Sequence, residues 1–129
     1  MKLIIAGSRT LKPSFDFILS SIKMLNITEN YQGEKGITKI VSGGARGVDN
    51  EGEHFASHMN LPVTYFRVHD RDWKDFGKAA GPMRNKKMAE YADVLLLIWD
   101  GKSKGSFNMM TEMNALNKPV FQVILRRDK

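Results

Sequence analysis

Short apolar runs recur along the 129-residue chain, and they lie at residues 2–6, 37–42, 62–68, 93–99 and 119–125. Most of these runs are continuous instead of alternating with polar residues. Continuous apolar runs are typical of strands that helices cover on both faces of a parallel sheet. The pattern therefore predicts five buried strands.

Segments with helical spacing separate the apolar runs. After the first run, apolar residues recur at intervals of three and four, at Phe15, Ile18, Leu19, Ile22 and Leu25. This spacing predicts an amphipathic helix over residues 14–28. Further helices are expected over 48–59, 82–91 and 106–116, the last of them ending close to Asn117.

Strands and helices thus alternate, which predicts an α/β fold: a Rossmann-like three-layer sandwich with a five-stranded parallel sheet. The expected strand order is 3-2-1-4-5, with a switch point between strands 1 and 4. Residues 1–129 are enough for one domain and too few for two. Residues 69–81 are predicted to be an unusually long loop between a strand and a helix, and such loops are often functional.

Composition narrows the classes of function. The chain has 20 Lys and Arg against 14 Asp and Glu, a formal charge of +6 that favours anionic partners. The basic residues are spread along the chain, which weakens a DNA-binding interpretation based on charge alone. Cysteine is absent, so disulfides and thiolate metal sites are excluded. The first apolar run is too short for a signal peptide or a membrane span, so we expect a soluble, cytoplasmic protein without a membrane partner.

The loops that follow the strands are the expected place for a ligand, because open parallel sheets bind ligands beyond the carboxyl ends of their strands. Besides residues 69–81, the loops at 7–10, 43–49 and 100–106 open there. Glycine turns that lead into a helix can direct backbone amides and the helix dipole at an anion. One glycine turn alone often binds nothing, and neither glycine-rich loop is a dinucleotide-binding or Walker motif. Several such loops together favour a shared anion-binding cleft.

Charged side chains strengthen this prediction. Arg9, Arg46 and Arg84 lie in or beside these loops, and a guanidinium group donates two hydrogen bonds to a phosphate or carboxylate. Asp49 is placed either to cap the second helix or to hold a ribose hydroxyl.

Other chemistry-bearing side chains have simpler interpretations. His54 and His58 are interpreted as helix-surface residues, and no metal site is predicted, because a His-Glu-x-x-His pattern is absent. Trp73 and Phe76 either stack on a base or pack a lid, and we favour packing.

Four segments carry a resemblance to a known family: "IIAGSR", "VSGGARGVD", "AGPMRNKKMAEYADVLLLIWDGKSKGS" and the closing "KPV". Together they resemble a bacterial and phage branch of the SLOG superfamily, the DUF2493 or YspA-like proteins, over nearly the whole chain. The superfamily includes the LOG nucleotide phosphoribohydrolases and the Smf/DprA DNA-processing proteins. The resemblance implies a Rossmann-like domain that binds a nucleotide or nucleotide derivative in the cleft, and no cofactor.

The resemblance also allows a comparison with the LOG enzymes, which cleave the N-glycosidic bond of nucleoside 5′-monophosphates. Arg84 stands four residues before Met88, as the arginine of those enzymes does before their methionine, and Gly105 and Ser106 match their Gly-Thr pair. The position of their catalytic glutamate is Met109, and the next acid, Glu112, is almost one helical turn further along, a rise of about 5.4 Å per turn. Whether the protein is an enzyme therefore stays open.

Three hypotheses follow. The first is a module that binds a nucleotide or an ADP-ribose-like derivative, through Gly7, Ser8, Arg9, Ser42, Gly43, Gly44, Arg46, Gly47, Asp49, Arg84, Asp100, Gly101, Gly105 and Ser106. The second is an N-glycosidase that acts on nucleoside monophosphates or NAD-like molecules, with Arg84 on the phosphate and Glu112, Asp49 or Asp100 as the carboxylate. The third, DprA-like binding of single-stranded DNA, is ranked last because the aromatic residues mostly fall in predicted core positions. A homo-oligomer is possible under all three hypotheses.

Overall fold

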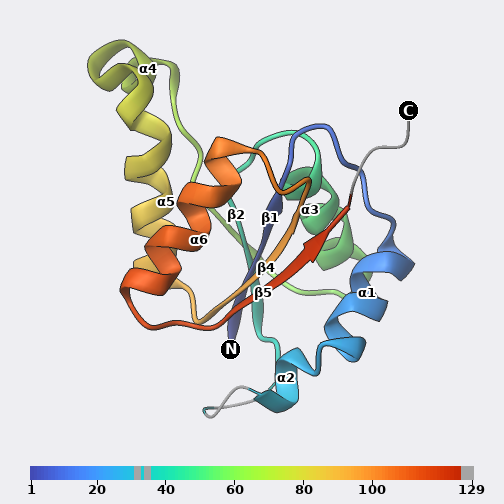
Figure 1. Ribbon diagram of the computed structural model, residues 1–129. Coiled ribbons are helices and arrows are strands. Elements are labelled where there is room, and N and C mark those ends of the chain that lie inside the picture. The colour runs from blue at the N-terminus through green and yellow to red at the C-terminus, as the bar shows by residue number, and fades with distance from the viewer. Residues whose placement is uncertain (31–32, 34–35, 126–129) are drawn as a thin grey trace.

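The computed structural model describes residues 1–30, 33 and 36–125, and Figure 1 shows its helices and strands. All strand pairs are parallel, and the sheet order is β3-β2-β1-β4-β5. The strands are β1 (Lys2–Gly7), β2 (Lys39–Ser42), β3 (Val63–Tyr65), β4 (Val94–Trp99) and β5 (Val120–Ile124). The predicted fold class and strand order are confirmed, although β2 and β3 are shorter than the apolar runs that predicted them.

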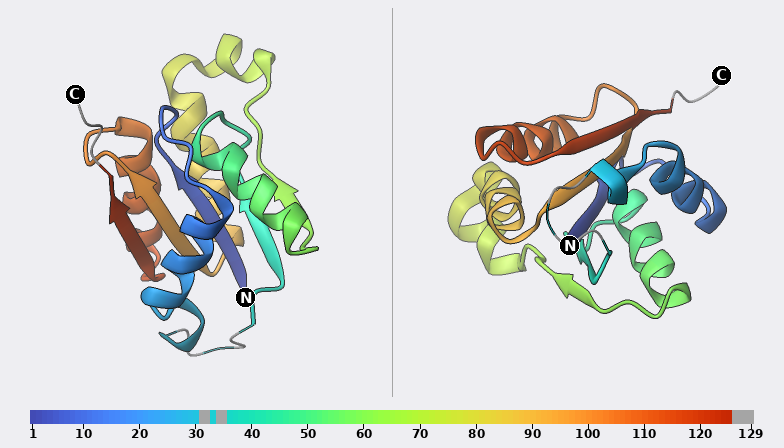
Figure 2. Two further views of the ribbon diagram at one scale, coloured as in Figure 1. Left: turned by 90° about the vertical axis from the view of Figure 1, so that its right-hand side faces the viewer. Right: turned by 90° about the horizontal axis from the view of Figure 1, so that it is seen from below.

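Helices cover both faces of the sheet. They are α1 (Phe15–Met24), α2 (Ile27–Asn30), α3 (Val48–His58), α4 (Asp70–Phe76), the 3₁₀-helix η1 (Gly77–Ala79), α5 (Ala80–Tyr91) and α6 (Lys104–Ala115). In the right-hand view of Figure 2, α1 and α3 lie on one side of the sheet and α5 and α6 lie on the other. None of the helices in the described residues has the length and apolar character needed to cross a membrane.

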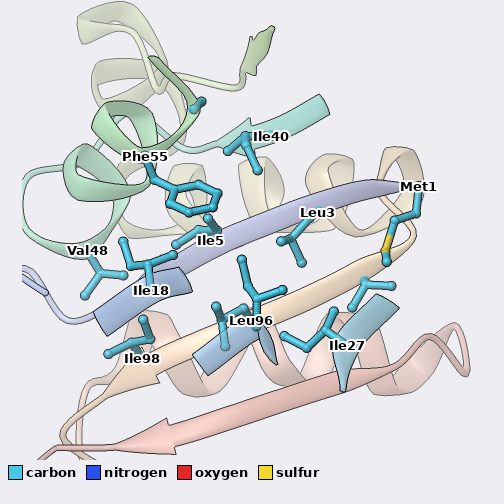
Figure 3. Packing of buried hydrophobic residues seen from close by; sticks show 13 residues of the cluster. Met1, Leu3, Ile5, Ile18, Ile27, Ile40, Val48, Phe55, Leu96 and Ile98 are labelled. Atoms are coloured by element: carbon cyan, nitrogen blue, oxygen red, sulfur yellow. The ribbon is translucent and has the colours of Figure 1, made fainter. Parts of the chain in front are cut away.

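The central strands are apolar throughout because both of their faces are covered. Leu3 and Ile5 of β1 pack against α1 and α3 in the first core cluster, part of which Figure 3 shows. Ile4 and Ala6 point to the opposite face and pack with Met88 of α5 in the second cluster. Successive residues of a strand point to opposite faces, so a strand buried on both faces loses the polar alternation.

The predicted helix over residues 14–28 is wrong at its carboxyl end. Ser14 caps α1 by accepting a hydrogen bond from the amide of Phe17 at 3.1 Å, but the helix ends at Met24. Asn26 has a φ of 50°, in the left-handed region that asparagine tolerates better than most residues. This residue turns the chain before the short helix α2 begins at Ile27.

The prediction of a long loop over residues 69–81 is also wrong. Most of this segment is helical, in α4 and η1, and α5 begins at Ala80, two residues before the predicted start. The amide of His69 donates to Asp72 Oδ2 at 3.0 Å, which stabilises the start of α4 locally. Gly77, with a φ of 56°, ends α4 and lets the chain turn into η1.

Candidate functional site

A cleft of about 350 Å³ opens beside the carboxyl end of β1, the strand that pairs with β4 in the middle of the sheet. We call it the site cleft. Helix α1, which connects β1 to β2, covers one face of the sheet, whereas α5 and α6, which precede and follow β4 in the sequence, cover the other. The strand order therefore reverses between β1 and β4, and the cleft occupies this topological switch point. The sequence-predicted residues that line it are Gly7, Ser8, Arg9, Asp49, Arg84, Asp100, Gly105 and Ser106.

Close pairing of β1 and β4 forms the floor of the site cleft. A side chain on Gly7 would place its Cβ 1.7 Å from the carbonyl oxygen of Ile98, so only glycine fits there. The amide of Ser8 donates to that same carbonyl at 3.2 Å. Ser8 Oγ accepts a hydrogen bond from the amide of Asp100 at 3.1 Å, which ties the loops after the two strands together.

Asp100 shapes the loop that leads into α6. Its Oδ1 atom accepts hydrogen bonds from the amides of Lys102 at 2.8 Å and Ser103 at 2.9 Å. These hydrogen bonds, the one from Lys102 first, hold the pKa of the Asp100 carboxyl below its ordinary value. The carboxylate is therefore already engaged in ordering the loop.

The first turn of α6 faces the site cleft with unused hydrogen-bonding groups. Ser103 is the N-cap, and its Oγ accepts from the amide of Ser106 at 3.4 Å. The backbone amides of Lys104 and Gly105 lie in the first turn, where no helix carbonyl stands one turn earlier to accept their hydrogen bonds. A Cβ on Gly105 would meet no atom within 4 Å, so its backbone is open to a ligand.

Ser106 provides a further unused group at the same place. Its side chain is only 4% exposed, and among the described residues its Oγ is the buried side-chain polar atom that has no hydrogen-bond partner. Buried hydroxyl groups are usually hydrogen-bonded, because leaving one unsatisfied costs about 1–3 kcal/mol. The Ser106 hydroxyl thus has unused hydrogen-bonding capacity in a residue that lines the site cleft.

Asp49 is a buried carboxyl group on the wall of the site cleft. It lies in the first turn of α3, is 6% exposed and accepts a hydrogen bond from the amide of Ala45 at 3.3 Å through Oδ2. Burial raises its pKa to about 6, although the Ala45 amide and the charge of Arg84 act in the opposite direction. The carboxyl thus titrates close to neutral pH.

Arg84 lies in the first half of α5, within the helix predicted over residues 82–91, and the protein already uses part of its guanidinium. Nη1 donates to the carbonyl oxygen of Gly43 at 2.7 Å and, more weakly, to that of Phe66 at 3.4 Å. Nε donates to Asn85 Oδ1 at 2.8 Å. Burial lowers the pKa of Arg84 from its ordinary value, with the carboxyl of Asp49 opposing the shift. Arg84 therefore joins α5 to the loops after β2 and β3 as well as lining the site cleft.

Sequence reasoning missed Asn85, which also lines the site cleft. Asn85 is 6% exposed, and its Nδ2 donates to Asn108 Oδ1 at 2.9 Å, which connects α5 to α6. The signal in the sequence was a polar residue three positions before the buried Met88, on the face of α5 that packs inward. Met109 lines the cleft and is 2% exposed, whereas Glu112 is not among the residues that line it.

The loop at residues 43–49 is arranged differently from the predicted phosphate cradle. The Gly44 amide donates to Ser42 Oγ at 3.0 Å, and Ser42 Oγ donates to Glu53 Oε2 at 2.7 Å, so this amide is engaged within the protein. Gly47, with a φ of 79°, packs against the backbone of Arg9, where a Cβ would lie 2.5 Å from the Arg9 carbonyl. The loop therefore supports the site cleft through its packing.

Some of the predicted residues line a different hollow. Gly43, Gly44 and Arg46 line a neighbouring hollow of about 340 Å³, together with Arg9 and Arg84, which it shares with the site cleft. We call it the middle hollow. Ser42, Gly47 and Gly101 line neither of these two spaces.

Four aromatic residues in the described part of the chain lie outside the core. Tyr65, Trp73, Phe76 and Phe107 have exposed fractions of 46%, 43%, 50% and 58%. Trp73 lines the middle hollow. These four rings are therefore not core residues, whereas seven other aromatic residues lie in or against the core clusters: Phe15, Phe17, Phe55, Phe66, Tyr91, Trp99 and Phe121.

The two histidines of α3 lie on the helix surface. His54 Nδ1 is 3.4 Å from Glu51 Oε2, and His58 Nδ1 is 2.9 Å from the carbonyl oxygen of His54. In the part of the chain that the structure describes, no three His, Cys, Asp or Glu side chains are grouped closely enough to hold a metal ion.

Comparison with solved structures places the fold in a known class. The chain superposes on the X-ray structure of DNA processing protein A (DprA) from Streptococcus pneumoniae with a TM-score of 0.63 and 17% sequence identity. The superposition covers 94% of this chain and 49% of that one, so the chain spans about half the length of DprA. The protein is therefore an α/β domain with a DprA-like, Rossmann-type fold.

Comparison with other sequences identifies a relative. The gene 61 protein of Mycobacterium phage D29 is 38% identical over 85 residues, which are 63% of this chain and 67% of the phage protein. The chain belongs to the family of this phage protein. A scan against models of protein families found no match.

Proposed function

We propose that the protein is a SLOG-type domain of the DUF2493 or YspA-like branch that binds a nucleotide or nucleotide-derived ligand by its phosphate. The observation that carries the proposal is the buried, unpartnered hydroxyl of Ser106, a residue in the first turn of α6 that lines the site cleft. The same turn offers the free amides of Lys104 and Gly105 and the positive end of the helix dipole. Together these groups form an anion site of the kind that binds phosphate.

The charges around the site cleft favour the same ligand. Arg9 and Arg84 both line it, and each guanidinium adds a permanent positive charge. The Ser106 hydroxyl is placed to donate to a phosphate oxygen, and a hydrogen bond to a charged group contributes about 1.5–3 kcal/mol. The first turn of α6 therefore orients the phosphate by hydrogen bonds, and the two arginines attract it by their positive charge.

The nucleoside part of the ligand is assigned to the side of the cleft formed by Asp49. A carboxyl with a pKa of about 6 is mostly ionised at pH 7 and accepts hydrogen bonds from sugar hydroxyls. An ADP-ribose-like ligand carries a ribose beside its phosphates, so it can bind both the first turn of α6 and the Asp49 carboxyl.

The direct test compares adenosine 5′-monophosphate with adenosine by isothermal titration calorimetry. These two probes differ only in the phosphate, so the proposal expects saturable binding of the monophosphate and at least tenfold weaker binding of adenosine. A competition with inorganic phosphate should displace the monophosphate. Equal binding of the two probes would show that the phosphate is not what the site recognises.

A second candidate function is N-glycosidic hydrolysis in the same cleft, with Asp49 as the carboxylate. The observation that favours it is the buried Asp49 carboxyl with its pKa near 6, close to the value that suits a general base at neutral pH. In this reaction the oxygen of a water molecule bonds to C1′, the bond from C1′ to the base nitrogen breaks, and the departing base takes up a proton. Asp49 would accept the proton that the water loses.

Release of free base from nucleoside monophosphates, measured by chromatography, tests this second function. Activity is expected to disappear in Asp49→Asn, which keeps the shape of the side chain, while binding of the monophosphate weakens far less, because the amide oxygen still accepts from a sugar hydroxyl. If the wild-type protein binds the monophosphate and releases no base, the protein is a binding module.

A further inference from the structure

A third space lies next to the middle hollow, between the end of β3 and helices α4 and α5. It has a volume of about 300 Å³, and its lining includes Tyr65, Arg67, Arg71, Phe76, Met83 and Lys87. We call it the α4 hollow. Figure 1 shows α4 beyond the amino-terminal end of α5, past the carboxyl ends of the strands, on the same side of the molecule as the loop that leads into α6.

The lining of the α4 hollow combines positive charge with exposed aromatic surface. Arg67, Arg71, Arg84 and Lys87 contribute cations, whereas the acid in its wall, Asp72, already accepts a hydrogen bond from the amide of His69. The same wall leaves large apolar side chains open to solvent, with exposed fractions of 46% for Tyr65, 50% for Phe76 and 41% for Met83. Exposed apolar side chains that gather in one patch with polar groups around it often mark a binding site.

One edge of the α4 hollow is formed by Tyr65 and Arg67, whose side chains contact each other. The guanidinium of Arg67 lies over the Tyr65 ring, 4.3 Å from its centroid, and its Nη2 is 3.9 Å from Glu53 Oε1. Gly44 makes room for this arrangement, because a Cβ there would lie 2.5 Å from Arg67 Cγ. The arginine is thus held across the glycine loop with its charge facing both neighbouring hollows.

The three spaces are neighbours that share lining side chains. Arg9 and Arg84 line both the site cleft and the middle hollow, and Arg67 and Arg84 line both the middle hollow and the α4 hollow. Arg84 borders all three, and its hydrogen bonds to the carbonyls of Gly43 and Phe66 fix it there. A ligand that leaves the site cleft therefore passes arginines before it reaches aromatic surface.

We propose that the α4 hollow is a subsite for a second base-bearing unit of the ligand, joined by phosphate to the unit in the site cleft. The proposal rests on the proposed function, since it extends the same ligand. Bases stack on aromatic side chains with about 1–3 kcal/mol per base, and the arginines of the middle hollow neutralise the linking phosphates. A ligand with charge alone would make no use of the exposed ring of Phe76, and an apolar ligand would bring no acceptor to Arg71 and Lys87.

Calorimetry with three probes tests the subsite: adenosine 5′-monophosphate, NAD⁺ and the 5′-phosphorylated dinucleotide pdApdA. The wild-type protein is expected to bind at least one of the two-unit probes about tenfold or more tightly than the monophosphate. Tyr65→Ala, Phe76→Ala and Lys87→Ala should each remove most of that gain and leave monophosphate binding unchanged.

Two control variants match these substitutions. Phe107→Ala removes an aromatic ring that is 58% exposed but does not line the α4 hollow, and Lys86→Ala removes an exposed lysine that is next to Lys87 in the sequence but does not line the α4 hollow. Both controls should bind all three probes like the wild-type protein. If they lower two-unit binding as much as their partners do, the effect is not local and the subsite is wrong.

The outcomes separate the subsite from the function on which it rests. Monophosphate binding without any gain for the two-unit probes overturns the subsite and leaves the proposed function intact. Failure of all three probes to bind overturns both. A gain for NAD⁺ supports the subsite with a diphosphate-bridged small molecule as its source, and a gain for pdApdA alone supports it with a single nucleic-acid strand as the source.

Discussion

Replacing Asp49 with asparagine should change how the stability of the protein depends on pH. Burial raises the pKa of Asp49 from 3.8 to about 6 in the folded protein. A shift of one pKa unit corresponds to about 1.4 kcal/mol, so ionising this carboxyl costs the folded state about 3 kcal/mol. Asparagine has nearly the same shape and avoids that cost, and its side-chain oxygen can still accept from the Ala45 amide.

The sign follows from the number of protons that each state binds. Between pH 3.8 and about 6 the folded protein holds the Asp49 proton more tightly than the unfolded chain does, so its stability falls as the pH rises. Below pH 3.8 the carboxyl is protonated in both states, and the stabilisation that comes from the tighter proton binding of the folded state is fully present. Above about pH 6 this stabilisation is lost.

Urea denaturation at pH 3.5 and pH 7 measures the effect as a difference between variants. The stability of Asp49→Asn relative to the wild-type protein should rise by about 3 kcal/mol between the two pH values, because the other titrating groups cancel in the comparison. Asp75→Asn, at an exposed position in α4, is the matched control for exchanging a carboxyl for an amide. If the stability of Asp49→Asn relative to the wild-type protein does not change with pH, Asp49 is not a buried carboxyl with a raised pKa.

Two further substitutions test the carboxyl end of α5 and the first turn of α6. Lys118 Nζ caps the end of α5 by donating to the carbonyls of Ala89 at 2.8 Å, Glu90 at 3.0 Å and Ala92 at 2.8 Å. Lys118→Met should therefore lower the free energy of unfolding, measured by urea denaturation, by about 2 kcal/mol. Unchanged stability would mean that this cap is formed only weakly in solution. Gly105→Ala should stabilise the protein by about 0.5–1 kcal/mol, since its Cβ meets no other atom, and should weaken binding of adenosine 5′-monophosphate several-fold by occupying the ligand's space. Full binding by Gly105→Ala would place the phosphate elsewhere.

The architecture was predictable because it depends on burial. The central strands are continuous apolar runs since β1 and β4 contribute to core clusters on both faces of the sheet, and this pattern can be read without knowledge of the partners. Helix α4 was not predictable in the same way. The sequence of Asp70–Phe76 has only two apolar residues, Trp73 and Phe76, none of its residues is buried, and a local capping contact stabilises its first turn.

The candidate site was predictable as a location and less so in its details. The glycines and Ser106 could be assigned to the edge of the sheet from their positions after apolar runs. The sequence does not show which amides remain free, and the structure engages the Gly44 amide with Ser42 while the first turn of α6 stays open. Nor does it show that Arg84 donates to the Gly43 carbonyl, since that contact joins residues 41 positions apart.

The central claim is that the Ser106 hydroxyl and the first turn of α6 bind a phosphate. The most direct measurement is the dissociation constant of adenosine 5′-monophosphate for the wild-type protein and for Ser106→Ala, by calorimetry at pH 7. Ser21→Ala is the control, because it removes a buried helical hydroxyl that bonds to the Phe17 carbonyl at 2.8 Å, away from the cleft. The account predicts binding at least tenfold weaker for Ser106→Ala and unchanged for Ser21→Ala. Equal affinity of Ser106→Ala and the wild-type protein would contradict it.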